Sequence, residues 1–332
     1  MAIFENLKLD KGLYTSEKGF TQALESVDPS ENYIGTSLEG LDAYQRQLKR
    51  FDIHVNGKNS DTVEKFFKTS DSAALFPEYI NRAVAQGMKN ANLLDKLIAT
   101  TTVIDSLDYR SITTNENHEA YSVNEGAHIP STTIKTKENL VKLHKRGRML
   151  VASYEAVRFQ RLDLFTVTLK QIGASIARTQ LDDAVDVLIN GDGNDNAAEV
   201  LRSSGSSTLN YNTLVSLWGV LNPFEMTTIA APIEMISAIL CLDEFKDAAA
   251  GLNFHGTGKY ATPLGAELVR NDTISEGTLI ALDKNCALEK VQAGEIITDF
   301  DKLIDRQLER AAITSIAGFA KIYSDASKVY KI

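Results

Sequence analysis

The chain has 332 residues, of which 43% are hydrophobic and 24% are charged, a composition typical of a folded globular protein. Its formal net charge of −9 disfavours nucleic-acid binding by the protein as a whole, because an acidic chain does not attract phosphate. No apolar run is long enough to cross a bilayer, and Cys241 and Cys286 show neither a metal-ligand spacing nor a disulfide framework.

The first part of the chain, residues 1–70, is polar and interrupted by glycines. Short helices are predicted at 17–26 and 38–51. These pieces carry too little apolar surface to form a domain of their own. We therefore expect an extended arm that packs against another surface.

From residue 70 onward the pattern becomes that of a packed domain. Pro77 near the start and Gly87 near the end delimit a predicted entry helix. Residues 93–104 are apolar and become β-branched toward their end, which predicts a helix that runs into a strand.

Residues 105–150 alternate between polar and apolar and are rich in threonine, which predicts two long antiparallel strands in a projecting hairpin. Because both faces are polar, the hairpin needs a partner surface. Its returning strand, residues 135–148, carries six cations against Glu138 alone, a net charge of +5. The cations are Lys135, Lys137, Lys142, Lys145, Arg146 and Arg148.

Two interpretations of this basic strand are open. It is either a solvated edge strand whose lysines prevent aggregation, or an arm that docks on an acidic neighbour such as another copy of the chain. Nucleic-acid binding is less favoured, because the strand lacks the interleaved aromatic residues that stack on single strands.

Residues 153–190 carry apolar side chains at helical spacing. One stripe contains Phe165, Leu169, Ile172 and Ile176, and it is continued by Leu181, Val185 and Leu188. The part from 162 to 190 predicts one unbroken helix of about 43 Å, at about 1.5 Å per residue. Such a helix would be the spine of a domain.

The stretch DAVDVLINGDGNDN, residues 183–196, resembles two known binding loops but matches neither. An EF-hand that starts at Asp192 would have Ala197 and Ser203 where glycine and glutamate are required. A dinucleotide turn needs its glycines between a strand and a following helix, whereas Gly191 and Gly193 follow a helix. We interpret the stretch as a helix end, with Gly191 in the left-handed position.

No other motif predicts catalysis or a cofactor. The stretch HGTGKYATP at 255–263 lacks the first glycine and the Ser or Thr of a phosphate-binding loop.

Residues 211–290 interleave helices and short strands, which predicts an α/β unit, and the last forty residues favour strands.

The order of these parts resembles a major capsid protein of tailed bacteriophages, with the Hong Kong 97-type fold. The most specific match is SYEAV at 153–157, followed by DDAVDVLINGDG at 182–193. The resemblance covers about residues 70–332 and implies an α+β fold of four parts. These are an N-terminal arm (1–70), a peripheral domain (71–104, 149–204 and 289–332), an extended hairpin loop (105–148) and an axial domain (205–288).

The resemblance implies a non-enzymatic shell protein without cofactor. It would self-assemble through hexamers and pentamers into an icosahedral head that encloses double-stranded DNA. The six cations of residues 135–148 would contact neighbouring subunits. Portal and scaffolding or decoration proteins would be further partners, and assembly would take place in the bacterial host cytoplasm. The alternatives are an encapsulin-type compartment shell and a soluble α/β enzyme with an unrecognised site.

Overall fold

The computed structural model describes all residues except 1–6, 15–18, 115–121, 130, 203–208, 247–263, 295, 304 and 306. The stretch HGTGKYATP therefore lies outside the described residues. The chain divides into two compact units. Unit 1 comprises Met1–Ala91, Gly147–Ala177 and Ile296–Thr314, and unit 2 comprises Asn92–Arg146, Arg178–Glu295 and Ser315–Ile332. No described helix is both long and apolar enough to span a membrane.

Helices dominate unit 1. Its first part holds α1 (Gly19–Val27), α2 (Ala43–Arg50), α3 (Ser70–Ala73) and α4 (Phe76–Asn90), with short 3-10 turns at Lys11–Tyr14, Ser30–Tyr33 and Val63–Phe67. The entry helix is confirmed as α4, with Pro77 in its first turn. After residue 147 follow α5 (Tyr154–Phe159) and the start of α6 (Leu162–Asn190).

The expectation of an extended N-terminal arm is wrong for the described residues. Phe20, Leu24, Leu48 and Phe66 lie in the same hydrophobic core as residues of α4 and α6. The predicted helices formed, but their apolar faces close on the core of their own chain. The few apolar residues of this segment suffice because α4 and α6 supply the rest of the core.

One buried arginine adds to this packing. The side chain of Arg46 is completely buried and donates from Nε to Asp28 Oδ2 at 2.9 Å. Its guanidinium also lies 4.4 Å from the centre of the Tyr33 ring. Because a charge removed from water needs such partners, this cluster ties the loop before α2 to the helix itself.

The predicted spine helix is confirmed, with the expected bounds of 162 and 190. Its apolar stripe serves two cores. Phe165, Leu169, Ile172 and Ile176 pack in the core of unit 1, whereas Leu181, Val185 and Leu188 pack in a core of unit 2. Within unit 1, α4 and α6 approach at Gly87 and Gly173, where an added Cβ would strike the backbone of the facing helix.

Two long strands contribute to both units. Strand β11 (Leu308–Lys321) pairs antiparallel with β10 (Ile297–Leu303) in unit 1. Its later residues pair antiparallel with β9 (Leu288–Ala293) in unit 2, and β9 pairs in parallel with β1 (Ile98–Ile104). Strand β4 (Leu143–Ser153) also pairs with β11.

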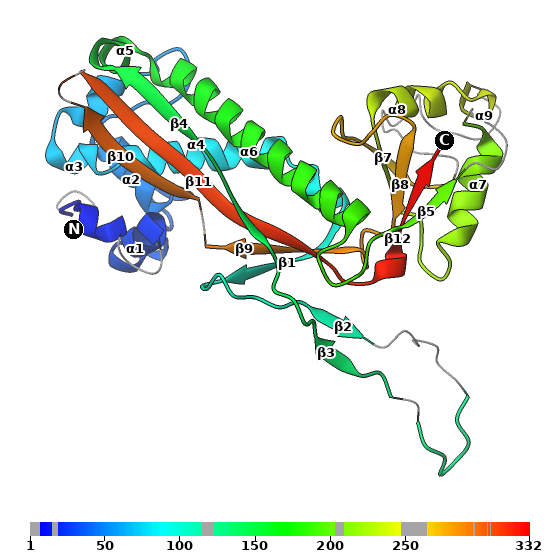
Figure 1. Cartoon of the computed structure of the whole chain (residues 1–332). Coiled ribbons are helices and arrows are strands. Elements are labelled where there is room, and N and C mark those ends of the chain that lie inside the picture. The colour runs from blue at the N-terminus through cyan, green and yellow to red at the C-terminus, as the bar shows by residue number, and fades with distance from the viewer. Residues whose placement is uncertain are drawn as a thin grey trace. The chain divides into compact units, whose positions relative to one another are not determined.

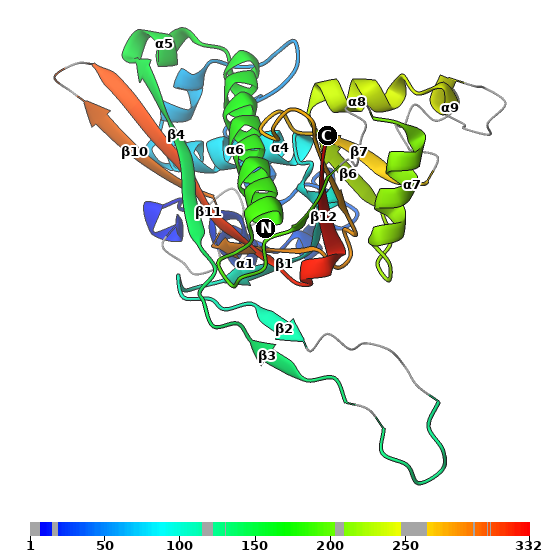
Figure 2. The same ribbon diagram turned by 45° about the vertical axis from the view of Figure 1, so that its right-hand side comes forward.

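Unit 2 contains a second five-stranded sheet, in the order β5-β12-β8-β6-β7. The strands are β5 (Glu199–Arg202), β6 (Thr228–Ala231), β7 (Glu267–Arg270), β8 (Thr278–Leu282) and β12 (Ser327–Lys331). Helices α7 (Tyr211–Val220) and α8 (Ile233–Leu240) lie beside it, followed by α9 (Asp243–Lys246), and α7 and α8 share a core with β6 and β8 (Figures 1 and 2). The α/β prediction for 211–290 holds for the described residues.

The last strand departs from the expected division of the chain. Residues 289–332 were expected to belong with 149–204, and β12 does pair in parallel with β5 there, but it also pairs antiparallel with β8, which lies within the expected axial domain. Sequence pattern cannot reveal this, because an apolar strand fits any sheet that leaves an edge for it.

The expected hairpin is present, but its strands are short. Strands β2 (Ile112–Thr114) and β3 (Ile134–Thr136) pair antiparallel over three residues each and form a separate two-stranded ribbon in unit 2 (Figure 1). The returning residues are not one strand, because β3 ends at Thr136 and β4 begins at Leu143. Without a core beneath it, an isolated two-stranded ribbon gains little from longer pairing.

Candidate functional site

The base of the hairpin in unit 2 is held by a network of hydrogen bonds. Ser111 immediately precedes β2 and Lys137 immediately follows β3, and the backbone N–H of Lys137 donates to Ser111 O at 2.8 Å. One step further, the N–H of Val141 donates to Tyr109 O at 2.9 Å. We call Ser111 and Lys137 the hairpin root. Both residues are buried, whereas β3 itself is exposed throughout.

The outgoing side of the root is attached to a buried carboxylate. Glu289 on β9 is only 5% exposed and accepts from Ser111 Oγ at 2.5 Å and Tyr109 OH at 2.7 Å. It also accepts from Thr102 Oγ1 at 2.5 Å. Burial and the hydrogen bond to Glu289 raise the pKa of Tyr109. These neutral donors satisfy a carboxylate that lies away from water.

The returning side of the root is attached to a second carboxylate. Lys137 Nζ lies 2.7 Å from Asp192 Oδ2, and the two side chains are 6% and 2% exposed. Asp192 also accepts from the backbone N–H of Lys321 at 3.0 Å, and Lys137 Nζ donates to Lys321 O. Although burial alone would raise the pKa of Asp192, the hydrogen bonds from Lys137 and Asn194 hold it below its usual value.

Asp192 is placed there by the end of the spine helix. The helix ends at Asn190, and Gly191 follows with φ +83° and donates its N–H to Val187 O, as the glycine pattern predicted. Asn196 Oδ1 then accepts from the N–H of Asp192 at 3.0 Å, which closes the turn. The stretch that resembled a calcium loop is thus a cap that directs one carboxylate inward.

The first carboxylate of this turn is already occupied by donors of its own chain. The carboxylate of Asp192 is engaged by Lys137, Lys321 and Asn194. Across the part of the chain that the structure describes, no three His, Cys, Asp or Glu side chains are grouped so that they could hold a metal ion.

The six predicted contact cations do not form one surface. Lys135 is exposed on β3 and Lys142 is exposed in the connection to β4, whereas Lys145 and Arg148 are exposed on β4 itself. The other two have partners in their own chain. Lys137 is the buried root residue, and Arg146 binds Asp183 of α6 with Nε to Oδ2 at 3.0 Å. Their charges are therefore already neutralised within the subunit.

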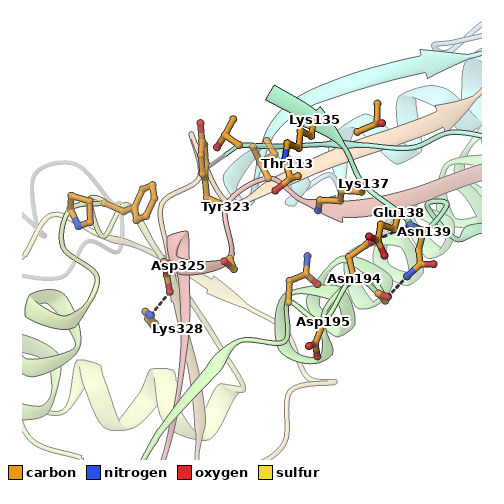
Figure 3. Close-up of a pocket in the computed structure, with 18 of the residues that line it drawn as sticks. Thr113, Lys135, Lys137, Glu138, Asn139, Asn194, Asp195, Tyr323, Asp325 and Lys328 are labelled. Atoms are coloured by element: carbon orange, nitrogen blue, oxygen red, sulfur yellow. Dashed lines mark hydrogen bonds and ion pairs between the residues drawn. The ribbon is translucent and has the colours of Figure 1, made fainter. Parts of the chain in front are cut away.

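A cavity of about 1140 Å³ lies beside the root. It is lined by the root strands, the loop after α6, the turn at 222–224 and the segment 322–328. Figure 3 shows Lys135, Lys137 and Asn139 on the hairpin side, with Asn194 close to Asn139. The backbone N–H of Asn139 donates to Asn194 Oδ1 at 2.9 Å, which is a further link between the hairpin and the helix cap.

The hairpin also exposes apolar side chains. Ile112 on β2 is 45% exposed and Ile134 on β3 is 65% exposed, and Ile129 before β3 is exposed as well. Ile112 pairs with Thr136, and Ile134 pairs with Thr114, so the two isoleucines are diagonal neighbours on one face of the ribbon. A narrow ribbon that carries apolar groups in this way fits a partner surface better than it fits solvent.

Sequence reasoning missed the two carboxylates that hold this site together. Asp192 was weighed only as the first ligand of a calcium loop, and its role depends on Lys137, which lies 55 residues away. Glu289 was not singled out. The available signal was an acidic residue next to Leu288 in the segment LEKVQA, which forms β9.

Comparison with known proteins gives a family and a fold. A family model described as "Phage capsid protein" matches residues 136–307, which is more than half of the chain. No curated protein matches the sequence.

Several solved structures share the fold at low sequence identity. The capsid of a native GTA particle has a TM-score of 0.53 at 13% identity and covers 73% of this chain and 90% of that chain. The virus-like particle from Pyrococcus furiosus has a TM-score of 0.51 at 11% identity, covering 76% of this chain and 98% of that chain. Microbacterium phage Oxtober96 gives a TM-score of 0.50 at 10% identity, covering 72% and 90%. The fold is therefore of the Hong Kong 97 type, as the order of the sequence segments predicted.

Proposed function

We propose that this chain, which belongs to the phage capsid protein family and is a major capsid protein of an icosahedral shell, encloses double-stranded DNA and contacts its neighbours through the hairpin. Family and fold point to a structural role and not to catalysis. The encapsulin-type alternative is less favoured, because the matching family model describes phage capsid proteins.

The observation that carries the proposed hairpin contact is the pair of exposed isoleucines on one face of the ribbon. Ile112 and Ile134 share that face, whereas the exposed Lys135 pairs with Thr113 on the opposite face. Burying such apolar area stabilises an interface by roughly 25 cal/mol per Å². Many modest contacts of this kind, repeated by closed symmetry, hold a shell together.

Charge favours another copy of the chain as the surface on which the hairpin docks. Residues 135–148 carry +5 on a chain of −9, so the rest of the chain carries −14. Opposite charges steer two surfaces together and suppress wrong partners. Of the six cations expected to dock, we retain Lys135, Lys142, Lys145 and Arg148, since Lys137 and Arg146 are paired within the subunit.

Further parts of the proposal concern organisation and partners. Unit 1 with the first half of α6 fits the peripheral domain, and the sheet of β5, β6, β7, β8 and β12 with α7 to α9 fits the axial domain. Hexamers and pentamers would be the building blocks. Portal and scaffolding or decoration proteins would join the shell in the host cytoplasm before the virion is complete.

Electron microscopy of the purified chain in negative stain tests the proposal. Wild-type protein should form closed shells of uniform size, whereas uniform monomers or dimers at high concentration would contradict a shell protein. Replacing Lys135, Lys142, Lys145 and Arg148 by glutamate should leave a folded subunit, judged by circular dichroism, that no longer assembles.

A matched control separates docking from the change in net charge. Glutamate at Lys58, Lys68, Lys89 and Lys284, which are all exposed, introduces the same charge change elsewhere. This control should assemble. If both quadruple variants assemble equally well, the hairpin cations have no docking role.

A further inference from the structure

The side chains of the two root residues attach the hairpin to the body of unit 2 at separate points, in addition to the link through Asn139. Ser111 and Lys137 face each other across the last rung of the hairpin, with 2.8 Å between Lys137 N and Ser111 O. Their side chains then diverge to different buried carboxylates, Glu289 on β9 and Asp192 after α6.

Two attachments restrict the hairpin more than one would. A single hydrogen bond leaves a two-stranded ribbon free to rotate about its point of attachment. Attachments on both strands remove that rotation, because each strand is held to a different element. The charge-assisted bond between Lys137 and Asp192 and the bond from Ser111 to Glu289 are of the strong, buried kind.

We infer that Asp192 and Glu289 are positioning residues that set the angle at which the hairpin leaves the subunit, and thereby determine whether its exposed isoleucines reach a second copy of the chain. This inference rests on the proposed function. It assigns assembly geometry to two residues whose side chains are buried within their own chain.

The Lys137–Asp192 pair is suited to this role for a physical reason. A buried ion pair contributes little net stability, since its attraction mostly offsets the cost of removing two charges from water. Its geometry is nevertheless specific, because a misplaced partner leaves an uncompensated charge in the interior. The pair therefore selects one arrangement of the root over the alternatives.

The test replaces both charges at once. A single change would leave one member of the pair buried without its partner and could unfold the subunit for that reason alone, whereas the double variant Lys137→Met with Asp192→Asn removes both charges of the pair together. We expect its denaturant midpoint to stay close to that of the wild type. Amide exchange at residues 134–141 should become about 10- to 100-fold faster, as expected for the loss of a charge-assisted hydrogen bond. Shell yield in negative stain should fall strongly.

A second variant and a matched control complete the experiment. Ser111→Ala releases the outgoing strand from Glu289 and should also accelerate exchange at the root. Replacing the pair Lys96–Glu267, another lysine–carboxylate pair of unit 2 at 2.6 Å, by Met and Gln should change neither root exchange nor assembly.

The outcomes distinguish the inference from the proposed function. If wild-type protein makes shells and the Lys137/Asp192 double variant makes them at the same yield, the positioning role is wrong and the proposed function stands. Unchanged exchange at the root would refute it equally. If wild-type protein makes no shells under any condition, the proposed function itself fails. If the double variant is unfolded, the Lys137–Asp192 pair stabilises the subunit as a whole, and the claim that it only positions the hairpin is refuted.

Discussion

The close crossing of α4 and α6 in unit 1 allows a prediction about how a glycine-to-alanine change affects the stability of the subunit. A Cβ added to Gly173 would lie 2.1 Å from Val84 O and 2.8 Å from Met88 N. At Gly87 it would lie 2.2 Å from Lys170 O. In both cases the obstacle is backbone, which cannot rotate away as a flexible side chain could.

The magnitude of the Gly173→Ala effect follows from two opposing contributions. Alanine is favoured over glycine in a helix interior by about 1 kcal/mol. Ordinary contact begins at 3.4 Å, so the helices would have to separate by about 1 Å. Overpacking of this kind costs roughly 1–3 kcal/mol, and a backbone clash belongs at the upper end. We therefore expect a net loss of about 2 kcal/mol in the free energy of unfolding.

Gly219 in α7 is the matched control. Nothing lies within 4 Å of a Cβ added there, so only the helix propensity changes. Gly219→Ala should stabilise the subunit by up to about 1 kcal/mol. Urea unfolding of the unassembled subunit, followed by circular dichroism, measures both variants. A Gly173→Ala subunit as stable as the wild type would refute the claim that the two helices are in backbone contact.

Two further predictions concern buried charges. Arg46→Met should lower the free energy of unfolding by about 3–5 kcal/mol in urea, because Asp28 would stay buried without its cation. A loss below about 1 kcal/mol would contradict this, because it would mean that the Asp28 carboxylate becomes hydrated in the variant. Burial lowers the pKa of Lys321 to about 8 from an ordinary value of 10.5. The unfolded chain therefore binds more protons than the folded one between those pH values, and stability should rise from about pH 8 to about pH 10.5. Lys321→Met should remove this rise. Urea midpoints of the variant and the wild type, measured at a series of pH values, check this. If the two proteins show the same pH dependence, Lys321 is not the group responsible.

The elements that could be predicted from sequence are those whose signal is local. The spine helix was predicted with both bounds, because its apolar stripe repeats every three to four residues over 29 positions and a glycine ends it. The entry helix and the C-terminal strands followed from the same kind of pattern. The family resemblance also came from local segments, SYEAV and the end of the spine helix.

Predictions about non-local contacts were less successful, since the interactions that decide them join distant residues. The N-terminal segment was expected to extend, and it folded on its own chain because α4 and α6 offered apolar faces that composition does not show. The prediction of long hairpin strands was wrong. Alternating polar and apolar residues predict a strand, but they do not show whether another strand or a core lies beside it to stabilise it.

The charges at the hairpin show the same division most clearly. The basic character of residues 135–148 can be read from the sequence, since charge is a property of composition. Which of these cations are exposed and able to meet a partner depends on the folded structure. Lys137 and Lys135 are two residues apart, yet Lys137 is buried against Asp192 and Lys135 is exposed. A buried lysine needs a nearby carboxylate, because burying an unpaired charge is costly. Lys137 can be buried because folding brings Asp192 next to it.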